Sequence, residues 1–569
     1  CGGDRDKKKR PLMAKIADLN CKKIYITDDN PRNENPKSIR NEISKNILRN
    51  KPFIIGDRSM AIKNAIQNSN PHEIILIAGK GHEEKQIYKN KIKYISDKSI
   101  VKKIKTLKKS LTKKQQNIFQ NQLFLKKILG KNKNLNFNGF SIDTRKLKND
   151  NLFLAVRGKN NHGEKFVKIA LKKGAGCIVS KKFLKKEKKN IIKVKDPILF
   201  LNKFAELKRE YTLAKIISVT GSAGKTSLKE LLKKLLVSFG STYASPKSFN
   251  NHLGVPLSLS NLTCDNKFGI FEVGMSNSGE IRKLSKLIRP DIGVITNIGE
   301  AHIENFKNIH GIAKAKSEII ENISSGGTMI LNRDDKFYNF LSRKAKRYNL
   351  KVFSFGKHLQ SDIRLKKVIK KGNKSTIFIE SKKEIIQLEI RDLNIYNVLA
   401  SIAILYELRI NFKSIRSKFE SLSPIAGRGK KHLITRYKKK FELIDESYNA
   451  NPLSVKNAIL KLNSIKKKQS KKYLVLGDML ELGSKSKKYH EELSKVINNS
   501  DIDKVFIKGK KTIFTYKYLN KNKRGNILQN IEDIDFNLSK MISNNDYLMI
   551  KGSNATGLND FCTKMIKGI

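Results

Sequence analysis

The chain has 569 residues, a formal net charge of +67 and 39% apolar residues. This length predicts several domains, and a transmembrane helix is not expected because no stretch approaches about 18 uninterrupted apolar residues. The five cysteines are scattered without CxxC spacing, which predicts neither a disulfide framework nor a zinc site and is typical of a reduced cytoplasm.

The positive charge could indicate a surface that binds nucleic acid or another polyanion. The lysines are spread from end to end of the chain, however, and do not concentrate in one region. We therefore expect solvated lysine faces and no nucleic-acid partner.

In chain order, residues 22–27 (KKIYIT) and 73–78 (EIILIA) are predicted to be short buried strands with helical stretches between them. Residues 98–127 are rich in Lys, Gln and Asn, lack Gly and Pro, and predict a linker or bridging helix. A compact segment of strands and helices follows at 128–212. The pattern of the whole chain predicts a multidomain α/β fold.

One kind of domain is expected twice. Near the start, CGGDRD at Gly3 is followed by LIAGKGHE at Gly81; near the end, LVLGDMLELG at Gly477 is followed by LMIKGSNATG at Gly552. Both segments show a glycine turn, a helix, several strand–helix units and a strand that ends in Lys-Gly. We predict two copies of one domain, at 1–97 and 429–569, the first without its initial strands.

A phosphate-binding loop is predicted in 214–236, AKIISVTGSAGKTSLKELLKKLL. An apolar strand leads into a G-x-x-G-K-T turn, and an amphipathic helix follows at once. The glycines let backbone N–H groups turn toward a triphosphate at the helix N-terminus. Lys225 can reach the phosphates and Thr226 can ligate Mg²⁺; the alternative is a chance glycine turn before a helix. The predicted loop residues are Gly221, Ser222, Ala223, Gly224, Lys225, Thr226 and Ser227.

Two further polar residues follow strands downstream of this loop. Glu272 ends the strand in GIFEVGMS, and His302 lies beyond the strand in DIGVITNIGEAH. Ligands of parallel sheets bind at the carboxyl ends of strands, so both side chains are candidate metal ligands. Taken alone, each could be an ordinary surface or loop residue.

A series of motifs occurs in one order along the rest of the chain: TGSAGKTS, NNHLGVP, FEVGMS, TNIGEAHIENF, AKAKSEII, YNVLASIA, GRGK, DESYNANP, GDMLELG and KGSN. They resemble the Mur ligase family, and over 128–569 its MurF branch, which joins D-alanyl-D-alanine to UDP-N-acetylmuramoyl-tripeptide. GGDRDKKKRP, TDDNPR and AGKGHE in 1–97 resemble the last domain of the MurE branch, which adds diaminopimelate. The resemblance implies a MurE–MurF fusion that lacks most of its MurE half.

The resemblance also implies the architecture and the chemistry. A P-loop domain at 213–428 would follow a UDP-sugar domain at 128–212, with Rossmann-like C-terminal domains. ATP and Mg²⁺ would activate a carboxylate as an acyl phosphate, and an amine would displace phosphate. The substrates would be D-Ala-D-Ala and UDP-MurNAc-tripeptide of the meso-diaminopimelate type, acted on by a cytoplasmic monomer.

The resemblance also implies roles for particular residues of the ATP and metal site. Lys225, Lys316, Asn251 and Arg428 would be catalytic, with Lys316 open to carbamylation; Thr226, Glu272, His302 and Lys316 would hold metal. Asn397 and the pair Asp445/Glu446 would lie around the base and ribose, and Arg428 would reach the phosphates. Asn449 and Asn451 would shape the same cleft, unless they only cap the helix expected near Pro452. Lys316 could instead be a surface lysine.

The remaining roles concern the other two substrate sites. Asp143, Thr144 and Arg145 would contact UDP, whereas NHGEKF departs from the family pattern and puts His162 and Glu164 in doubt. In residues 1–97 the implied diaminopimelate residues are Arg5, Asp29, Asn30, Arg32, Gly79 and Glu83, of which Arg32 suits a bidentate pair with a carboxylate. Lys8 replaces a family glycine there. This segment could also be a remnant that only packs.

Three other function classes remain open. A nucleic-acid-stimulated P-loop ATPase is favoured only by the charge. A folylpolyglutamate-synthase-like ligase shares the superfamily, but DESYNANP and GDMLELG are not typical of it. The third class is a non-catalytic scaffold, and the intact phosphate loop argues against it because a scaffold does not need one.

Overall fold

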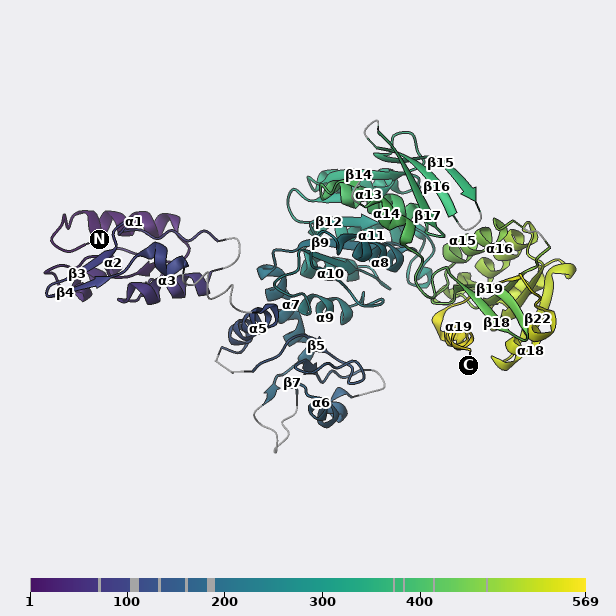
Figure 1. The fold of residues 1–569 in the computed structure, drawn as a ribbon, viewed down its shortest axis with the longest axis horizontal. Coiled ribbons are helices and arrows are strands. Elements are labelled where there is room, and N and C mark those ends of the chain that lie inside the picture. Colours follow the sequence, from purple (N-terminus) through teal and green to yellow (C-terminus); the bar gives the residue numbers. More distant parts are fainter. Residues whose placement is uncertain are drawn as a thin grey trace. The chain divides into compact units, whose positions relative to one another are not determined.

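The computed structural model describes residues 2–69, 73–102, 112–130, 135–158, 162–181, 190–371, 374–381, 384–412, 415–466 and 469–568. The chain divides into two compact units, and Figure 1 shows the helices and strands of which they consist. The first comprises Cys1–Lys193 and Glu210–Leu213, and the second comprises Val194–Arg209 and Ala214–Ile569. Among the described residues, no helix is both long and apolar enough to cross a membrane.

The first unit begins with three helices around two short parallel strands and a separate hairpin. Strand β1 pairs with β2, and β3 pairs with β4. The elements are α1 (Lys9–Asn20), β1 (Tyr25–Ile26), α2 (Pro36–Lys45), β2 (Phe53–Ile54), α3 (Arg58–Gln67), β3 (Lys85–Tyr88) and β4 (Lys91–Tyr94).

The predicted strand at 73–78 is wrong, and only two residues of the predicted strand at 22–27 form β1. Residues 73–78 belong to no strand, and Ile74 and Leu76 are 98% and 82% exposed. A strand needs a neighbour that pairs with its N–H and C=O groups. The corresponding strand of the second copy, β23, has such neighbours on both sides, but the described part of the first copy supplies none at 73–78.

The rest of the first unit is a parallel sheet in the order β5-β6-β7-β8, with helices beside it. The stretch at 98–127, predicted to be a linker or a bridging helix, contributes to α5, in which Phe124 and Leu125 are fully buried and Phe124 packs edge-on against Tyr211 at 5.0 Å. Residues 103–111 of that stretch lie outside the described residues. The elements are α5 (Lys113–Leu129), β5 (Phe140–Ser141), β6 (Leu152–Leu154), η1 (Gly163–Phe166), α6 (Val167–Lys172), β7 (Cys177–Ser180) and β8 (Ile191–Lys193).

The second unit contains a nine-stranded sheet in the order β10-β11-β9-β12-β13-β14-β15-β16-β17. Pairing is parallel as far as β15 and antiparallel beyond it. The strands are β9 (Lys215–Thr220), β10 (Thr242–Ala244), β11 (Phe268–Glu272), β12 (Ile292–Ile295), β13 (Thr328–Asn332), β14 (Lys351–Gly356), β15 (Ile363–Lys371), β16 (Lys374–Ser381) and β17 (Glu384–Arg391).

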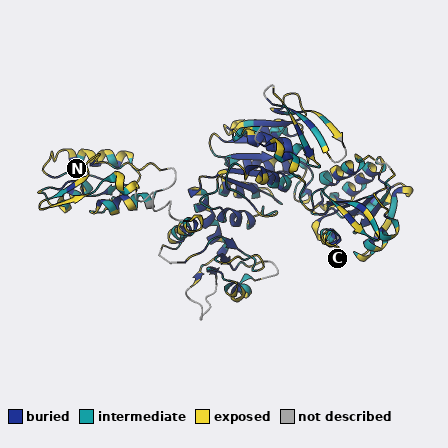
Figure 2. Cartoon of the chain, in the orientation of Figure 1, coloured by how far each residue is buried: buried dark blue, intermediate teal, exposed yellow. Residues whose placement is uncertain are grey.

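Both faces of this sheet are covered, which explains its near-continuous apolar strands. Ile217 of β9 packs into a core with α8 and α13, and the adjacent Ile216 packs into a core with α10, α11 and α12. Figure 2 shows the parallel strands as the most buried part of the chain. The helices are α7 (Pro197–Tyr211), α8 (Lys225–Leu236), α9 (Gly254–Ser260), α10 (Glu280–Ile288), η3 (Ile303–Asn305), α11 (Ile309–Ser317), η4 (Glu318–Asn322), α12 (Tyr338–Arg347), α13 (Ile395–Glu407) and α14 (Arg416–Ser421).

The last sheet of the second unit has the order β18-β19-β23-β20-β21-β22 and is parallel except for the β18–β19 pair. The motifs DESYNANP, GDMLELG and KGSN follow the neighbouring strands β19, β20 and β23, so their loops meet at one edge. The elements are β18 (Lys430–Arg436), β19 (Lys439–Glu446), α15 (Pro452–Asn463), β20 (Lys472–Gly477), η6 (Gly483–Lys485), α16 (Ser486–Asn498), β21 (Lys504–Lys508), α17 (Ile513–Lys517), η7 (Lys521–Lys523), β22 (Arg524–Leu528), α18 (Glu532–Met541), β23 (Tyr547–Lys551), η8 (Asn554–Thr556) and α19 (Leu558–Lys567). The predicted multidomain α/β fold is confirmed.

Candidate functional site

The predicted phosphate loop connects β9 to α8, and its glycines are sterically required. Gly221 has φ +146°, and a Cβ there would lie 1.9 Å from Thr296 Oγ1. Gly224 has φ +84°, a backbone conformation that side chains disfavour. The loop turns tightly and α8 starts at Lys225, so the positive end of this helix faces the space above the loop.

Residues after β12 hold this loop in place. Ala223 N donates to Asn297 Oδ1 at 2.9 Å, and Thr296 Oγ1 donates to Ala223 O at 2.6 Å. Ser222 Oγ donates to Gly299 O at 2.8 Å. These partners lie within the motif TNIGEAHIENF, from which the sequence argument selected only His302. Thr296, Asn297 and Gly299 therefore fix the shape of the loop.

Several cations surround a cavity above the loop. Lys225 Nζ donates to Gly221 O at 2.7 Å; burial lowers the pKa of Lys225, and Arg428 lowers it further while Glu272 opposes the shift. Burial also lowers the pKa of Lys316 well below its ordinary value, helped by the charge of Lys225. The pKa of Lys551 is lowered by burial and by Arg428. Cations that repel one another in one cavity suit a polyanionic ligand such as a triphosphate.

Glu272 lies beside Thr226, as expected for an Mg²⁺ site. Thr226 Oγ1 donates to Glu272 Oε2 at 2.7 Å, and Asn250 Nδ2 donates to Glu272 Oε1 at 2.8 Å. Glu272 is 1% exposed. Asn250 was missed by the sequence argument, although it stands next to the selected Asn251 in NNHLGVP.

This donor set fits Mg²⁺. The ion prefers oxygen ligands and is commonly held by one or two carboxylates plus phosphates and water. Within the described ranges, no cluster of three or more His, Cys, Asp and Glu side chains exists that could hold a metal by itself. Glu272 and Thr226 would therefore hold Mg²⁺ together with the phosphates, and the ion would supply charge neutralisation there.

His302 lines the same cavity but also contacts the last sheet's loops. Its Nδ1 lies 2.7 Å from Glu481 Oε2, and this contact holds the pKa of Glu481 below its ordinary value. His302 and Glu481 both have positive φ, +57° and +63°, and such strain at non-glycine residues persists where the surroundings impose it. The motif GDMLELG, which had no assigned role, thus reaches the histidine.

The cavity has a volume of about 1930 Å³. It brings together most of the residues predicted for the ATP, metal and catalytic roles. They are Ser222, Ala223, Gly224, Lys225, Thr226, Ser227, Asn251, Glu272, His302, Lys316, Asn397, Arg428, Glu446, Asn449 and Asn451. Gly221 and Asp445 do not line it.

Of Asp445 and Glu446, both predicted to lie around the base and ribose, only Glu446 lines the cavity. Neighbouring residues of a strand point to opposite faces, so only Glu446 faces the cavity. Asp445 is buried, and its carboxylate accepts hydrogen bonds from Gly427 N at 2.6 Å and Ser447 Oγ at 2.6 Å. Asp445 therefore stabilises the turn beside Arg428.

The other predicted cavity residues have defined partners. Asn397 Nδ2 donates to Gly224 O at 3.4 Å, which places Asn397 against the phosphate loop. The Arg428 guanidinium lies over the Tyr448 ring at 4.4 Å. Asn251 Oδ1 accepts from Gly254 N at 2.9 Å near the start of α9.

Asn451 has both of the roles considered from the sequence. Its Oδ1 accepts from Ser454 N at 2.8 Å and caps α15, which begins at Pro452. Its Nδ2 donates to Ser222 O at 3.1 Å. Tyr448 OH donates to Ser248 Oγ at 3.0 Å, so this loop contacts the phosphate loop and its neighbour directly.

The candidate UDP residues lie in the first unit and are paired with one another. Arg145 Nε and NH2 donate to Asp143 Oδ1 and Oδ2, each at 3.0 Å, and this pair lowers the pKa of Asp143. Thr144 O accepts from Lys173 Nζ at 3.0 Å. His162 occupies the N-cap position of η1 without a capping hydrogen bond from its side chain, and Glu164 Oε1 accepts from Ser180 Oγ at 3.4 Å.

The candidate diaminopimelate residues, except Arg5, have short contacts within the first unit. Asn30 Nδ2 donates to Glu83 Oε2 at 2.6 Å, and Arg32 NH1 donates to Gly3 O at 3.0 Å. A Cβ on Gly79 would lie 3.4 Å from Asp29 Oδ2. Arg5 and Lys8 are exposed.

A buried carboxylate bonded to the threonine of a glycine loop, between a parallel strand and a helix, characterises the P-loop class of nucleoside-triphosphate-binding proteins. The comparisons with known proteins give the particular family. Three models of Mur ligase domains match four parts of the chain: the middle domain at 219–405, the glutamate ligase domain at both 1–81 and 432–554, and the family's catalytic domain at 136–209. The glutamate ligase domain model thus matches within both segments for which one domain type was predicted.

Relatives cover most of the chain. The UDP-N-acetylmuramoyl-tripeptide–D-alanyl-D-alanine ligase of Rickettsia prowazekii is 32% identical over 74% of this chain and 94% of its own. The ligase of the same name from Bacillus subtilis is 30% identical over 75% and 93%. The crystal structure of MurF ligase from Thermotoga maritima in complex with ADP is similar with a TM-score of 0.65, 26% identity and coverage of 76% and 97%. The chain belongs to the Mur ligase family.

Proposed function

We propose that residues 128–569 are an ATP-dependent ligase that joins D-alanyl-D-alanine to UDP-N-acetylmuramoyl-tripeptide, an intermediate of peptidoglycan precursor synthesis in the cytoplasm. The cavity in which Lys225, Lys316 and Arg428 converge beside Glu272 carries the proposal. The relatives of that name support it, since they align over 93–94% of their length.

The residues suit a two-step amide synthesis. A substrate carboxylate oxygen attacks the γ-phosphorus of ATP and ADP leaves; the dipeptide amine then attacks the acyl carbon, loses a proton and releases phosphate. Lys225 and Arg428 would offset the charge that gathers on the phosphates. Thr226 and Glu272 would hold Mg²⁺, and Glu446 would bind the ribose hydroxyls.

Lys316 would supply a further negative group to this site. Its burial beside Lys225 favours the neutral amine, the form that adds CO₂ to give a carbamate anion. The carbamate, which forms as the amine nitrogen loses a proton, would replace an uncharged amine by an anionic oxygen donor in the cavity that Glu272 also lines. This would explain a lysine that is 2% exposed in a site that binds a metal ion.

In this proposal each domain has its own role, and the domains are 1–97, 128–212, 213–428 and 429–569. Residues 1–97 would hold meso-diaminopimelate, with Arg32 reading its distal carboxylate, and Asp143, Thr144 and Arg145 would bind UDP. G-x-x-G-K-T occurs once in the 569 residues, so the first domain does not perform a ligation by itself. The chain would act as a monomer.

Two assays of ADP release test the proposal with the purified chain and Mg²⁺. With UDP-MurNAc-tripeptide and D-Ala-D-Ala we expect turnover to the pentapeptide; its absence in a folded protein would refute the ligase assignment. With UDP-MurNAc-dipeptide and diaminopimelate we expect none, and activity would refute the statement that the first domain performs no ligation by itself. ADP release that depends on added RNA or DNA would favour the ATPase alternative.

A further inference from the structure

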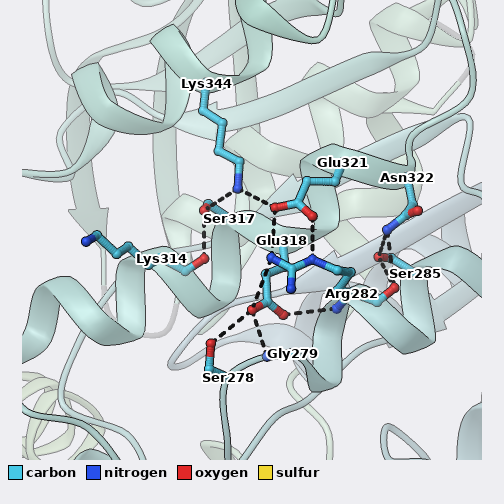
Figure 3. A network of polar contacts seen from close by, with 10 residues as sticks. All are labelled: Ser278, Gly279, Arg282, Ser285, Lys314, Ser317, Glu318, Glu321, Asn322 and Lys344. Atoms are coloured by element: carbon cyan, nitrogen blue, oxygen red, sulfur yellow. Dashed lines mark hydrogen bonds and ion pairs between the residues drawn. The ribbon is translucent and has the colours of Figure 1, made fainter.

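Glu318 is buried although the proposed chemistry gives it no role. It lies two residues after Lys316 in AKAKSEII and is 2% exposed. Its Oε1 accepts from Gly279 N at 2.7 Å and Ser278 Oγ at 3.2 Å, and its Oε2 accepts from Arg282 N at 3.0 Å (Figure 3). The carboxylate therefore closes the N-terminal end of α10.

These hydrogen bonds join two walls of the cavity. After Glu272, the chain lines the cavity from Gly274 to Ser276 before α10 begins. On the other side, α11 carries Lys316 and passes into η4 at Glu318. The first N–H groups of a helix lack intrahelical acceptors and attract a negative charge, so the carboxylate holds the two walls at a fixed separation.

The loop after Glu272 is also tied to the loop of His302. Asn305 Nδ2, three residues beyond the histidine, donates to Ser276 O at 3.1 Å. The segment between β11 and α10 thus contacts both other elements that carry candidate metal ligands. Glu318 is the charged member of this set.

A second carboxylate on η4 provides an internal comparison. Glu321 accepts from Arg282 Nε at 2.6 Å and from Lys344 Nζ at 2.7 Å, and Lys344 Nζ also donates to Ser317 Oγ at 3.0 Å (Figure 3). The Arg282 side chain is 55% exposed. None of these residues lines the cavity. The outer network links α10, η4 and α12, and it shares Arg282 with Glu318, since Arg282 NH2 lies 3.9 Å from Glu318 Oε1.

We propose that Glu318 is a positioning residue of the ligase reaction: it sets Lys316 against the loop that follows Glu272. The inference rests on the proposed function. Misplacement of a reacting group by about 1 Å can cost a hundredfold in rate, so a contact that fixes these two walls controls turnover without touching substrate.

Glu318→Gln tests this role, and Glu321→Gln is its matched control. Both oxygens of Glu318 accept from backbone N–H groups, so an amide in either orientation sets its NH₂ against one donor and leaves that N–H unpaired. We expect kcat to fall at least about tenfold in Glu318→Gln, with KM for ATP within about twofold. Glu321→Gln loses ion pairs of the outer network and should keep kcat within about twofold.

A binding measurement accompanies the kinetics. Isothermal titration calorimetry with Mg²⁺ and a non-hydrolysable ATP analogue should show at least about threefold weaker Mg²⁺ binding in Glu318→Gln. Glu321→Gln should bind Mg²⁺ like the wild type, since only the Glu318 substitution shifts the segment that follows Glu272. Equal kcat in the two variants, or a change confined to melting temperature, would overturn the proposal. If Glu318→Gln does not fold, Glu318→Asp and Ser278→Ala must both lower kcat more than Glu321→Gln does. An inactive wild type would refute the proposed function instead.

Discussion

Replacement of Thr226 by valine tests the centre of the candidate site. The hydroxyl donates to Glu272 Oε2 at 2.7 Å, and the two residues are 4% and 1% exposed. Valine keeps the shape but removes the donor and leaves a buried carboxylate oxygen without this partner. Losing a hydrogen bond to a charged group costs about 1.5–3 kcal/mol, which for a domain of about 200 residues lowers the melting temperature by roughly 3–12 °C.

The same change should abolish most turnover. The hydroxyl is the proposed Mg²⁺ ligand, so we expect ADP release to fall about a hundredfold or more. Differential scanning fluorimetry and the coupled ADP assay measure the two effects, with Thr226→Ser as the control that keeps the hydroxyl. A valine variant with wild-type stability and turnover would refute the hydrogen bond and the metal role together; equal losses in valine and serine variants would indicate packing rather than the hydroxyl.

Other substitutions separate the remaining roles. Lys225→Met should remove turnover. At pH values below the lowered pKa of this amine, it should also raise the melting temperature of the ligand-free chain, because burial disfavours the charged amine; a less stable variant in thermal melts would contradict this. Glu446→Gln should raise KM for ATP about three- to tenfold, whereas Asp445→Asn should chiefly lower thermal stability. The reverse pattern in steady-state kinetics and thermal melts would indicate that Asp445, and not Glu446, binds the nucleotide. Burial lowers the pKa of Lys208 to about 7. Between about pH 7 and 10.5 the unfolded chain therefore carries one more proton at this amine than the folded chain does. The destabilisation caused by burying the charge is complete below about pH 7 and decreases as pH rises through this range. Lys208→Met should therefore raise the melting temperature more at pH 7 than at pH 10, and a constant difference would argue against this pKa.

Much of the candidate site could be predicted from the sequence because its chemistry is local. Residues 214–236 combine an apolar strand, a glycine turn and an amphipathic helix, and each part has its own physical signal. Glu272 and His302 were found because parallel strands end at one edge of a sheet. The Asn451 cap was visible in the proline that follows it.

Tertiary structure decided the features that depend on neighbours distant in sequence. The apolar run at 73–78 has strand composition, but within the described ranges no strand pairs with its backbone, and α5 has polar composition but buries Phe124 and Leu125. Asp445 and Glu446 read as a pair, yet the strand turns them to opposite faces. The sequence around Glu318 does not indicate its proposed role, because that role depends on hydrogen bonds to the N-terminal end of a helix that begins 38 residues earlier, at Glu280. Composition and spacing determine which groups a chain can offer; hydrogen-bond pairing and burial, which are set by the packed neighbours, decide which of them face the cavity.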